Sequence, residues 1–201
     1  MFPILAGYNV TANRRRKVNK TRNSVPKGSA VSISKAAKPS VKSLIVALAS
    51  EDGVVRVKAR QQLVAYGGRS IAPLIETLSN ENAWVRWEAA KALSQIANPS
   101  SVRALLEALS DKTFEVRWLA AEGLIRIGRK AVVPLLETLV EHSDSLSLRE
   151  GIHHVLYDMN RGNLDNTLRP VLTALEGTEP SLEAPLAARG ALNALNKRGP
   201  L

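Results

Sequence analysis

The sequence predicts an all-α fold, a right-handed α-solenoid of about five helical hairpins that follows a basic N-terminal arm. Three observations support this. One pattern of apolar residues returns every 30 or 31 residues through most of the chain. Hydrophobic residues make up 45% of the 201 residues but aromatic ones only 4%, and the abundant alanine and leucine favour helices. The excess of positive charge is confined to the N-terminal quarter.

The internal repeat can be followed residue by residue. A Val-Arg pair is followed by an alanine three positions after the arginine and a leucine four positions later, a spacing that keeps all of them on one helix face. The pairs are Val55-Arg56, Val85-Arg86 and Val116-Arg117, the alanines Ala59, Ala89 and Ala120, and the leucines Leu63, Leu93 and Leu124. A shorter apolar segment and a polar turn precede each pair, so every unit predicts a helical hairpin.

Five such units account for most of the chain. We expect repeats at about residues 41–70, 71–100, 101–130, 131–163 and 166–198. These boundaries divide the chain into a basic extension, residues 1–38, and a solenoid domain, residues 39–201. The fifth unit has Ala184-Pro185 where others have Val-Arg, and terminal units of a repeat stack are expected to be atypical.

The spacing, the Val-Arg-x-x-Ala-Ala core and the Leu-x-x-Ala-Leu ends resemble HEAT repeats, specifically the short variety of phycobilisome lyase subunits and many bacterial proteins. The resemblance extends over roughly residues 41–198. It implies the solenoid fold. It does not select one function, because this fold serves as scaffold, as regulator and occasionally as enzyme.

The net charge of +10 comes from the N-terminal quarter of the chain. Residues 1–50 contain ten of the 28 basic residues and none of the 18 acidic ones, which leaves 18 bases and 18 acids in the remainder. The candidate contacts to nucleic acid or to another anionic partner are Arg14, Arg15, Arg16, Lys17, Lys20 and Arg22. Residues 1–38 lack helical periodicity and are expected to be disordered or extended when free.

Four interpretations of this extension stay open. Its charges suit the phosphates of nucleic acid, with salt-sensitive affinity. They also suit an acidic protein or an anionic membrane. An acid-poor, arginine-rich leader is typical of an organellar targeting segment as well. The fourth interpretation is a tail that only improves solubility.

One arginine recurs at the start of each second helix. These residues, Arg56, Arg86, Arg117 and Arg149, form a column in the alignment of the repeats. The family resemblance implies that they reach acids or carbonyl groups of neighbouring inter-helix turns, for which Asp52, Asn82 and Asp111 are candidates. A planar guanidinium suits such pairing. The alternative is a row of cations that faces a ligand.

Tryptophans follow in the adjacent column. Trp87 and Trp118 occupy the position after the arginine in successive repeats, and Trp84 precedes Trp87 on the same helix. Together with Lys91 and Arg126 they predict a protein-binding groove lined by the second helices, because tryptophan is enriched at binding hot spots. Simple packing between repeats is the competing interpretation.

The chain offers little for catalysis or cofactor binding. Glu150, His154 and Asp158 are spaced four apart on one predicted helix face, but no second histidine-bearing helix completes a metal site. Cysteine is absent, which excludes thiolate chemistry, and no phosphate-binding glycine loop or nucleophile motif occurs. Glu76, Glu107 and Glu137 form an acidic stripe, interpreted as a solvated face. We therefore expect a protein that is not an enzyme and that binds no metal or cofactor.

These observations favour a non-enzymatic scaffold or adaptor subunit whose groove and basic tail dock on an acidic protein or a larger complex. The alternatives are nucleic-acid binding led by the tail and a bilin-lyase-like chaperone subunit, which the short-repeat resemblance suggests. No signal-peptide core and no run of about 18 apolar residues is present. We therefore expect a soluble, cytoplasmic protein, with organellar targeting by the N-terminal segment left open.

Overall fold

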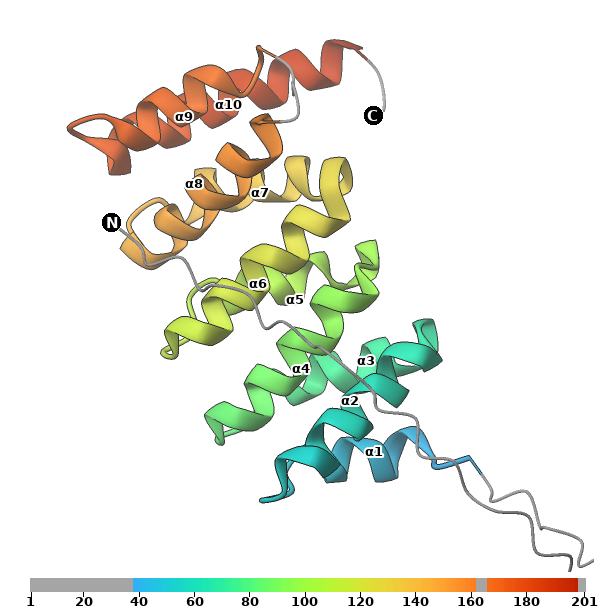
Figure 1. Cartoon of the computed structure of the whole chain (residues 1–201). Helices are drawn as coiled ribbons and strands as arrows, with labels where there is room; N and C mark the ends of the chain where they lie inside the picture. Colours follow the sequence, from blue (N-terminus) through green and yellow to red (C-terminus); the bar gives the residue numbers. More distant parts are fainter. Residues whose placement is uncertain (1–37, 162–165, 199–201) are drawn as a thin grey trace, which may run out of the picture. The chain divides into compact units, whose positions relative to one another are not determined.

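The computed structural model describes residues 38–161 and 166–198. Within these ranges the chain forms ten α-helices, two short 3-10 helices and no β-strand (Figure 1). The predicted all-α solenoid is confirmed. None of the helices in these ranges has the length and apolar character needed to cross a membrane. The basic extension, apart from its last residue, lies outside the described residues.

The α-helices come as five consecutive pairs, each a first and a second helix joined by a short turn. The pairs are α1 (Val41–Ala47) with α2 (Gly53–Tyr66), α3 (Gly68–Thr77) with α4 (Ala83–Ile96), α5 (Val102–Ala108) with α6 (Phe114–Ile127), α7 (Val132–Glu141) with α8 (Leu146–Asn160), and α9 (Arg169–Glu176) with α10 (Pro180–Arg198). The 3-10 helices Pro99–Ser101 and Gly128–Ala131 lead into α5 and α7.

Polar side chains fix where second helices begin. Asp52 and Asn82 each accept a hydrogen bond from the backbone N–H two residues later, at the starts of α2 and α4. Ser145 caps α8 in a similar way. These bonds satisfy backbone N–H groups that lack a partner inside the helix, typically worth about 1 kcal/mol per cap.

The second helices α2, α4, α6 and α8 pack side by side in one layer, with first helices packed behind them (Figure 1). The core lies between the layers. Its recurring element is the leucine seven positions after the repeat arginine, fully buried at Leu63, Leu93, Leu124 and Leu156. Each such side chain contributes about 1.5 to 3 kcal/mol through its burial, so the repeated leucine holds successive hairpins in register.

The last pair departs from this arrangement. Here the first helix, α9, packs against α8, and the second helix, α10, packs against α7 (Figure 1). Small buried residues on α10, Ala184, Ala188 and Ala191, permit its close approach. The sequence alignment places Ala184-Pro185 in the Val-Arg column, but these residues lie outside the layer of second helices. The exposed surface of that layer is therefore formed by the first four repeats.

Candidate functional site

The recurrent arginines close the turns of their own repeats. Arg56 Nη1 donates to Ser50 O at 2.7 Å, Arg86 Nη1 to Asn80 O at 2.9 Å and Arg117 Nη1 to Asp111 O at 2.8 Å, and Arg149 Nη1 donates to Ser143 O. In every case the acceptor lies six residues before the arginine. A guanidinium thus satisfies a turn carbonyl and ties it to the first turns of the second helix.

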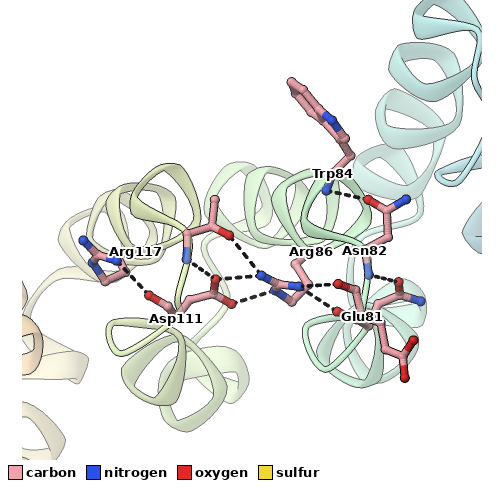
Figure 2. A network of polar contacts seen from close by, with 8 residues as sticks. Glu81, Asn82, Trp84, Arg86, Asp111 and Arg117 are labelled. Carbon is pink, nitrogen blue, oxygen red and sulfur yellow. Dashed lines mark hydrogen bonds and ion pairs between the residues drawn. The ribbon is translucent and has the colours of Figure 1, made fainter.

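Arg86 also joins two repeats (Figure 2). Its Nε donates to Asp111 Oδ2 at 2.7 Å and its Nη2 to Asp111 Oδ1 at 3.0 Å, while Nη2 also donates to Thr113 Oγ1 at 3.0 Å. The Arg86 residue is only 4% exposed. A buried bidentate pair of this kind holds two groups in one geometry, so the α4 helix and the following turn are locked together.

The environment of Asp111 sets its protonation. Partial burial by itself raises the pKa of this carboxyl, because desolvation disfavours the charged form. Hydrogen bonds from Arg86 and from the backbone N–H of Thr113, together with the Arg86 charge, outweigh the burial. The pKa of Asp111 is therefore held below its ordinary value, so this carboxyl is ionised at neutral pH.

The other two expected acceptors have a different role. Asp52 Oδ1 accepts from Val54 N–H at 2.8 Å, and Asn82 Oδ1 accepts from Trp84 N–H at 2.9 Å. Both side chains are used as helix caps. Among the three candidates for contact with the arginine column, Asp111 is the one whose side chain binds an arginine.

A second buried cluster joins α2 to α4, and the sequence reasoning missed it. Glu88 accepts a hydrogen bond from Arg60 Nη1, and its Oε1 lies 3.5 Å from Arg56 Nε. The side chains of Glu88 and Arg60 are 4% and 12% exposed. The available signal was that Glu88 and Arg60 are charged at positions where the third repeat has Leu119 and Ala121. Two guanidinium groups share one carboxylate here.

The predicted tryptophans lie at the surface of the second-helix layer. Trp84 is 65% exposed and Trp118 is 46% exposed, whereas Trp87 is half-buried. Figure 2 shows the Trp84 indole pointing away from the Arg86 network. The Arg56 Cζ atom lies 5.9 Å from the centre of the Trp84 ring, and Arg60 Cζ lies 5.6 Å from that of Trp87. Each guanidinium thus lies within cation-π range of an indole.

Aromatic residues continue onto α6 and α8. Trp118 stacks on His154 with ring centres 4.7 Å apart, and Phe114 lies 6.4 Å from Trp118. The Arg117 Cζ atom is 5.5 Å from the Phe114 ring centre. Arginine beside an exposed aromatic ring therefore recurs on successive repeats.

One exposed apolar residue stands at the first or second position of each second helix in the layer. These residues, which we call the apolar row, are Val54, Trp84, Phe114 and Leu146, and they are 58% to 65% exposed. Their helices are neighbours in space. Single exposed apolar residues need no explanation, but these four recur at the same place in successive repeats.

Lys91 and Arg126 lie farther along their helices. Lys91 is half-buried one turn beyond Trp87, and Arg126 is exposed in the last turn of α6, eight residues beyond Trp118. The apolar row lies at the opposite end of these helices. The structure thus brings Trp84 and Trp87 together with Arg56 and Arg60, while Lys91 and Arg126 extend the same layer away from that group.

The acidic residues and the histidine that share one face of α8 do not form a common site. His154 stacks on Trp118, Asp158 Oδ1 lies 3.7 Å from Arg161 Nη1, and Glu150 is exposed. Within the described ranges no group of three or more acidic or histidine residues is positioned to hold a metal ion. The basic candidates Arg14, Arg15, Arg16, Lys17, Lys20 and Arg22 lie outside the described residues.

A groove lies between α5 and α7. Its volume is about 650 Å³, and Glu107, Glu137, Glu141 and Asp144 contribute acidic side chains to its lining. Two of these belong to the acidic stripe of the first helices. The groove therefore lies on the first-helix layer and reaches the turn before α8 and the first residues of that helix.

Stacked helical hairpins with buried inter-repeat arginines define an α-solenoid repeat protein, and comparison with known proteins gives the family. The family model of HEAT repeats matches residues 41–124 and residues 102–193. These segments together cover more than half of the chain, which therefore belongs to the HEAT-repeat family.

Among solved structures, the chain is similar to the designed armadillo repeat protein YIII(Dq)4CqI, with 18% identity, coverage of 78% of this chain and 100% of that chain, and a TM-score of 0.37. Comparison with curated proteins found no match.

Proposed function

We propose that this chain is a non-enzymatic scaffold or adaptor subunit, whose second-helix layer docks on a protein partner. The observation that carries the proposal is the apolar row, with Trp84 and Phe114 on adjacent helices and Trp118 beside them. HEAT-repeat proteins commonly mediate protein-protein interaction, which agrees with this role. A row of large apolar groups at a solvent-exposed surface loses unfavourable hydration when a partner covers it.

The supporting network explains why this surface suits binding. Arg86 and the turn arginines hold the starts of the second helices in place, and the apolar row lies at those same starts. The backbone of the row is thus fixed before a partner arrives. Binding then requires little further ordering of the scaffold, which reduces the entropic cost of association.

The basic N-terminal segment has a supporting role in this proposal. Its nine bases, with no acid among them, attract an anionic region of the partner assembly and raise the rate of encounter. Nucleic-acid binding led by this segment is the competing function. Affinity purification with and without nuclease distinguishes the scaffold function from nucleic-acid binding.

Affinity purification from a lysate of the source organism tests the proposal. The full chain is compared with the Phe114→Ala and Trp118→Ala double variant, with and without nuclease. A matched control, Leu182→Ala, removes an apolar side chain that is 63% exposed, close to the 61% of Phe114, from α10, outside the layer. We expect protein partners that survive nuclease, persist with the control and are lost with the double variant. Recovery of nuclease-sensitive material alone would instead assign the chain to nucleic-acid binding.

A further inference from the structure

We infer that the junction of α2 and α4 binds an acidic segment of the partner that is extended in the polyproline II conformation. The docking site consists of Arg56, Arg60, Trp84 and Trp87. This inference rests on the proposed function and deepens it, because it names the chemistry of the segment that the second-helix layer recognises.

The first argument for an acidic segment is the positive charge of the junction. The half-buried cluster holds two guanidinium groups, Arg56 and Arg60, against the single carboxylate of Glu88. The nearby carboxylate of Asp52 is used at the N-cap of α2. A cationic cluster with restricted access to water is stabilised by an added anion more strongly than a solvated surface charge would be. A carboxylate of the partner supplies that anion.

The second argument, for apolar residues in the segment, comes from the two indole rings of the junction. Arg56 lies against Trp84 and Arg60 lies against Trp87, so each guanidinium is already positioned over a ring. This stacking restricts the arginine rotamers and leaves the strongly exposed face of Trp84 open to an apolar side chain. The site therefore offers a positive group and an apolar surface together, and it fits a segment in which acidic and apolar residues alternate.

The repeat geometry selects the conformation of that segment. Packed helices lie about 8 to 10 Å apart, so neighbouring members of the apolar row, such as Trp84 on α4 and Phe114 on α6, are offset by about one such spacing. A polyproline II segment returns a side chain to the same face every three residues, after about 9 Å. An apolar residue at every third position therefore meets successive members of the row. Aromatic surfaces are the usual docking partners of such segments.

Fluorescence anisotropy with a defined probe tests the inference on the full chain. The probe is a fluorescein-labelled peptide of four Leu-Asp-Pro repeats. A Ser-Asp-Pro peptide of equal length keeps the charge and reports binding by the basic N-terminal segment alone, and a Leu-Lys-Pro peptide reverses the charge. We expect the Leu-Asp-Pro probe to bind at least about tenfold more tightly than either control, a difference of about one hot-spot interaction. Equal binding of the Leu-Asp-Pro and Ser-Asp-Pro peptides would overturn the inference.

Variants at the junction locate the binding. Trp84→Ala removes an exposed ring, and Arg56→Gln leaves the Arg60 and Glu88 pair intact, so neither variant unpairs a buried charge. Each variant is expected to lower the affinity for the Leu-Asp-Pro probe about tenfold. The Arg56→Lys variant is expected to retain most of the affinity. Arg149→Gln is the matched control, because it removes the same type of turn contact from α8. Undiminished binding by Trp84→Ala would contradict the assignment.

A second measurement, with a single-stranded oligothymidine as the probe, distinguishes peptide binding from nucleic-acid binding. It is needed because exposed aromatic rings beside arginines also suit unstacked bases. We expect Trp84→Ala to leave the affinity of this oligonucleotide unchanged. A loss of oligonucleotide affinity with no loss for the peptide would overturn the inference in favour of nucleic acid. The proposed function is judged separately, by the lysate experiment with the Phe114 and Trp118 variants, which lie outside the docking site.

Discussion

Arg86 of α4 binds Asp111 of the following repeat through two nearly parallel hydrogen bonds of 2.7 and 3.0 Å. The same guanidinium reaches back to the carbonyl groups of Asn80 and Glu81 in its own turn. One buried side chain therefore connects three segments of backbone from two repeats (Figure 2). Coupling between repeats is what makes a solenoid unfold cooperatively, and this contact supplies it at the second and third hairpins.

Asp111→Ala is expected to destabilise the fold by about 3 kcal/mol, because it leaves the buried Arg86 charge without its carboxylate. Urea denaturation followed by circular dichroism measures the change. The matched control is Asp144→Ala, an exposed acid in the next inter-helix turn, for which we expect little change. A loss no larger than that of the control would show that the pair contributes little to stability.

The same pair predicts a pH dependence. The pKa of Asp111 is lower in the folded chain than in the unfolded one, so its contribution to stability is fully present above the unfolded value of about 3.9. This contribution is lost as the pH falls below that value and through the lowered folded pKa. The difference in unfolding free energy between wild type and Asp111→Asn should therefore shrink in acid. Urea titrations from pH 6 to pH 2 measure it, and a difference that stays constant would contradict the assignment.

Glu88→Ala is expected to cost about 3 kcal/mol, since two guanidinium groups of low exposure would remain without an acid. Replacing both Arg60 and Glu88 by methionine should recover part of that loss, because Arg60 is then exchanged for an apolar side chain of similar size and Arg56 alone stays without an acid. Chemical denaturation of the single and double variants gives the comparison. If the double variant were no more stable than Glu88→Ala, unpaired charge would not be the cause of the stability loss in Glu88→Ala.

Two glycines inside helices should respond oppositely to alanine. A Cβ atom at Gly123 would lie 2.9 Å from Leu105 Cδ1 and 3.3 Å from Ser94 Cα, so Gly123→Ala must push α6 away from its neighbours. Gly190 on α10 has no such neighbour within 4 Å. Gly190→Ala should stabilise the helix by about 0.5 to 1 kcal/mol. Thermal unfolding midpoints measure both, and a stabilised Gly123→Ala variant would disprove the close packing of α4, α5 and α6.

Local patterns predicted several elements correctly because they depend on residues close in sequence. The recurring leucines, Leu63 to Leu156, marked the buried face through helical periodicity alone. The arginine column marked the starts of the second helices. Three tryptophans were singled out from residue type and spacing, and two of them are strongly exposed.

Other features depend on residues far apart in sequence and could not be found in this way. The Glu88 cluster required knowledge that α2 and α4 are adjacent, since its arginines lie 28 and 32 residues earlier in the chain. Phe114 was overlooked because nothing in its own repeat distinguishes an exposed apolar residue from a buried one. Its meaning comes from Val54, Trp84 and Leu146 on neighbouring helices.

The sequence by itself determined the helical hairpins, their period and the identity of the buried face, because these follow from backbone hydrogen bonding and apolar spacing within about 30 residues. Only the tertiary structure decided which charges are shared between repeats, which aromatic rings stay exposed, and that α10 packs against α7 and not in the second-helix layer. Those outcomes depend on side-chain size and pairing across helices, where small alanines on α10 and the single carboxylate of Glu88 select one arrangement.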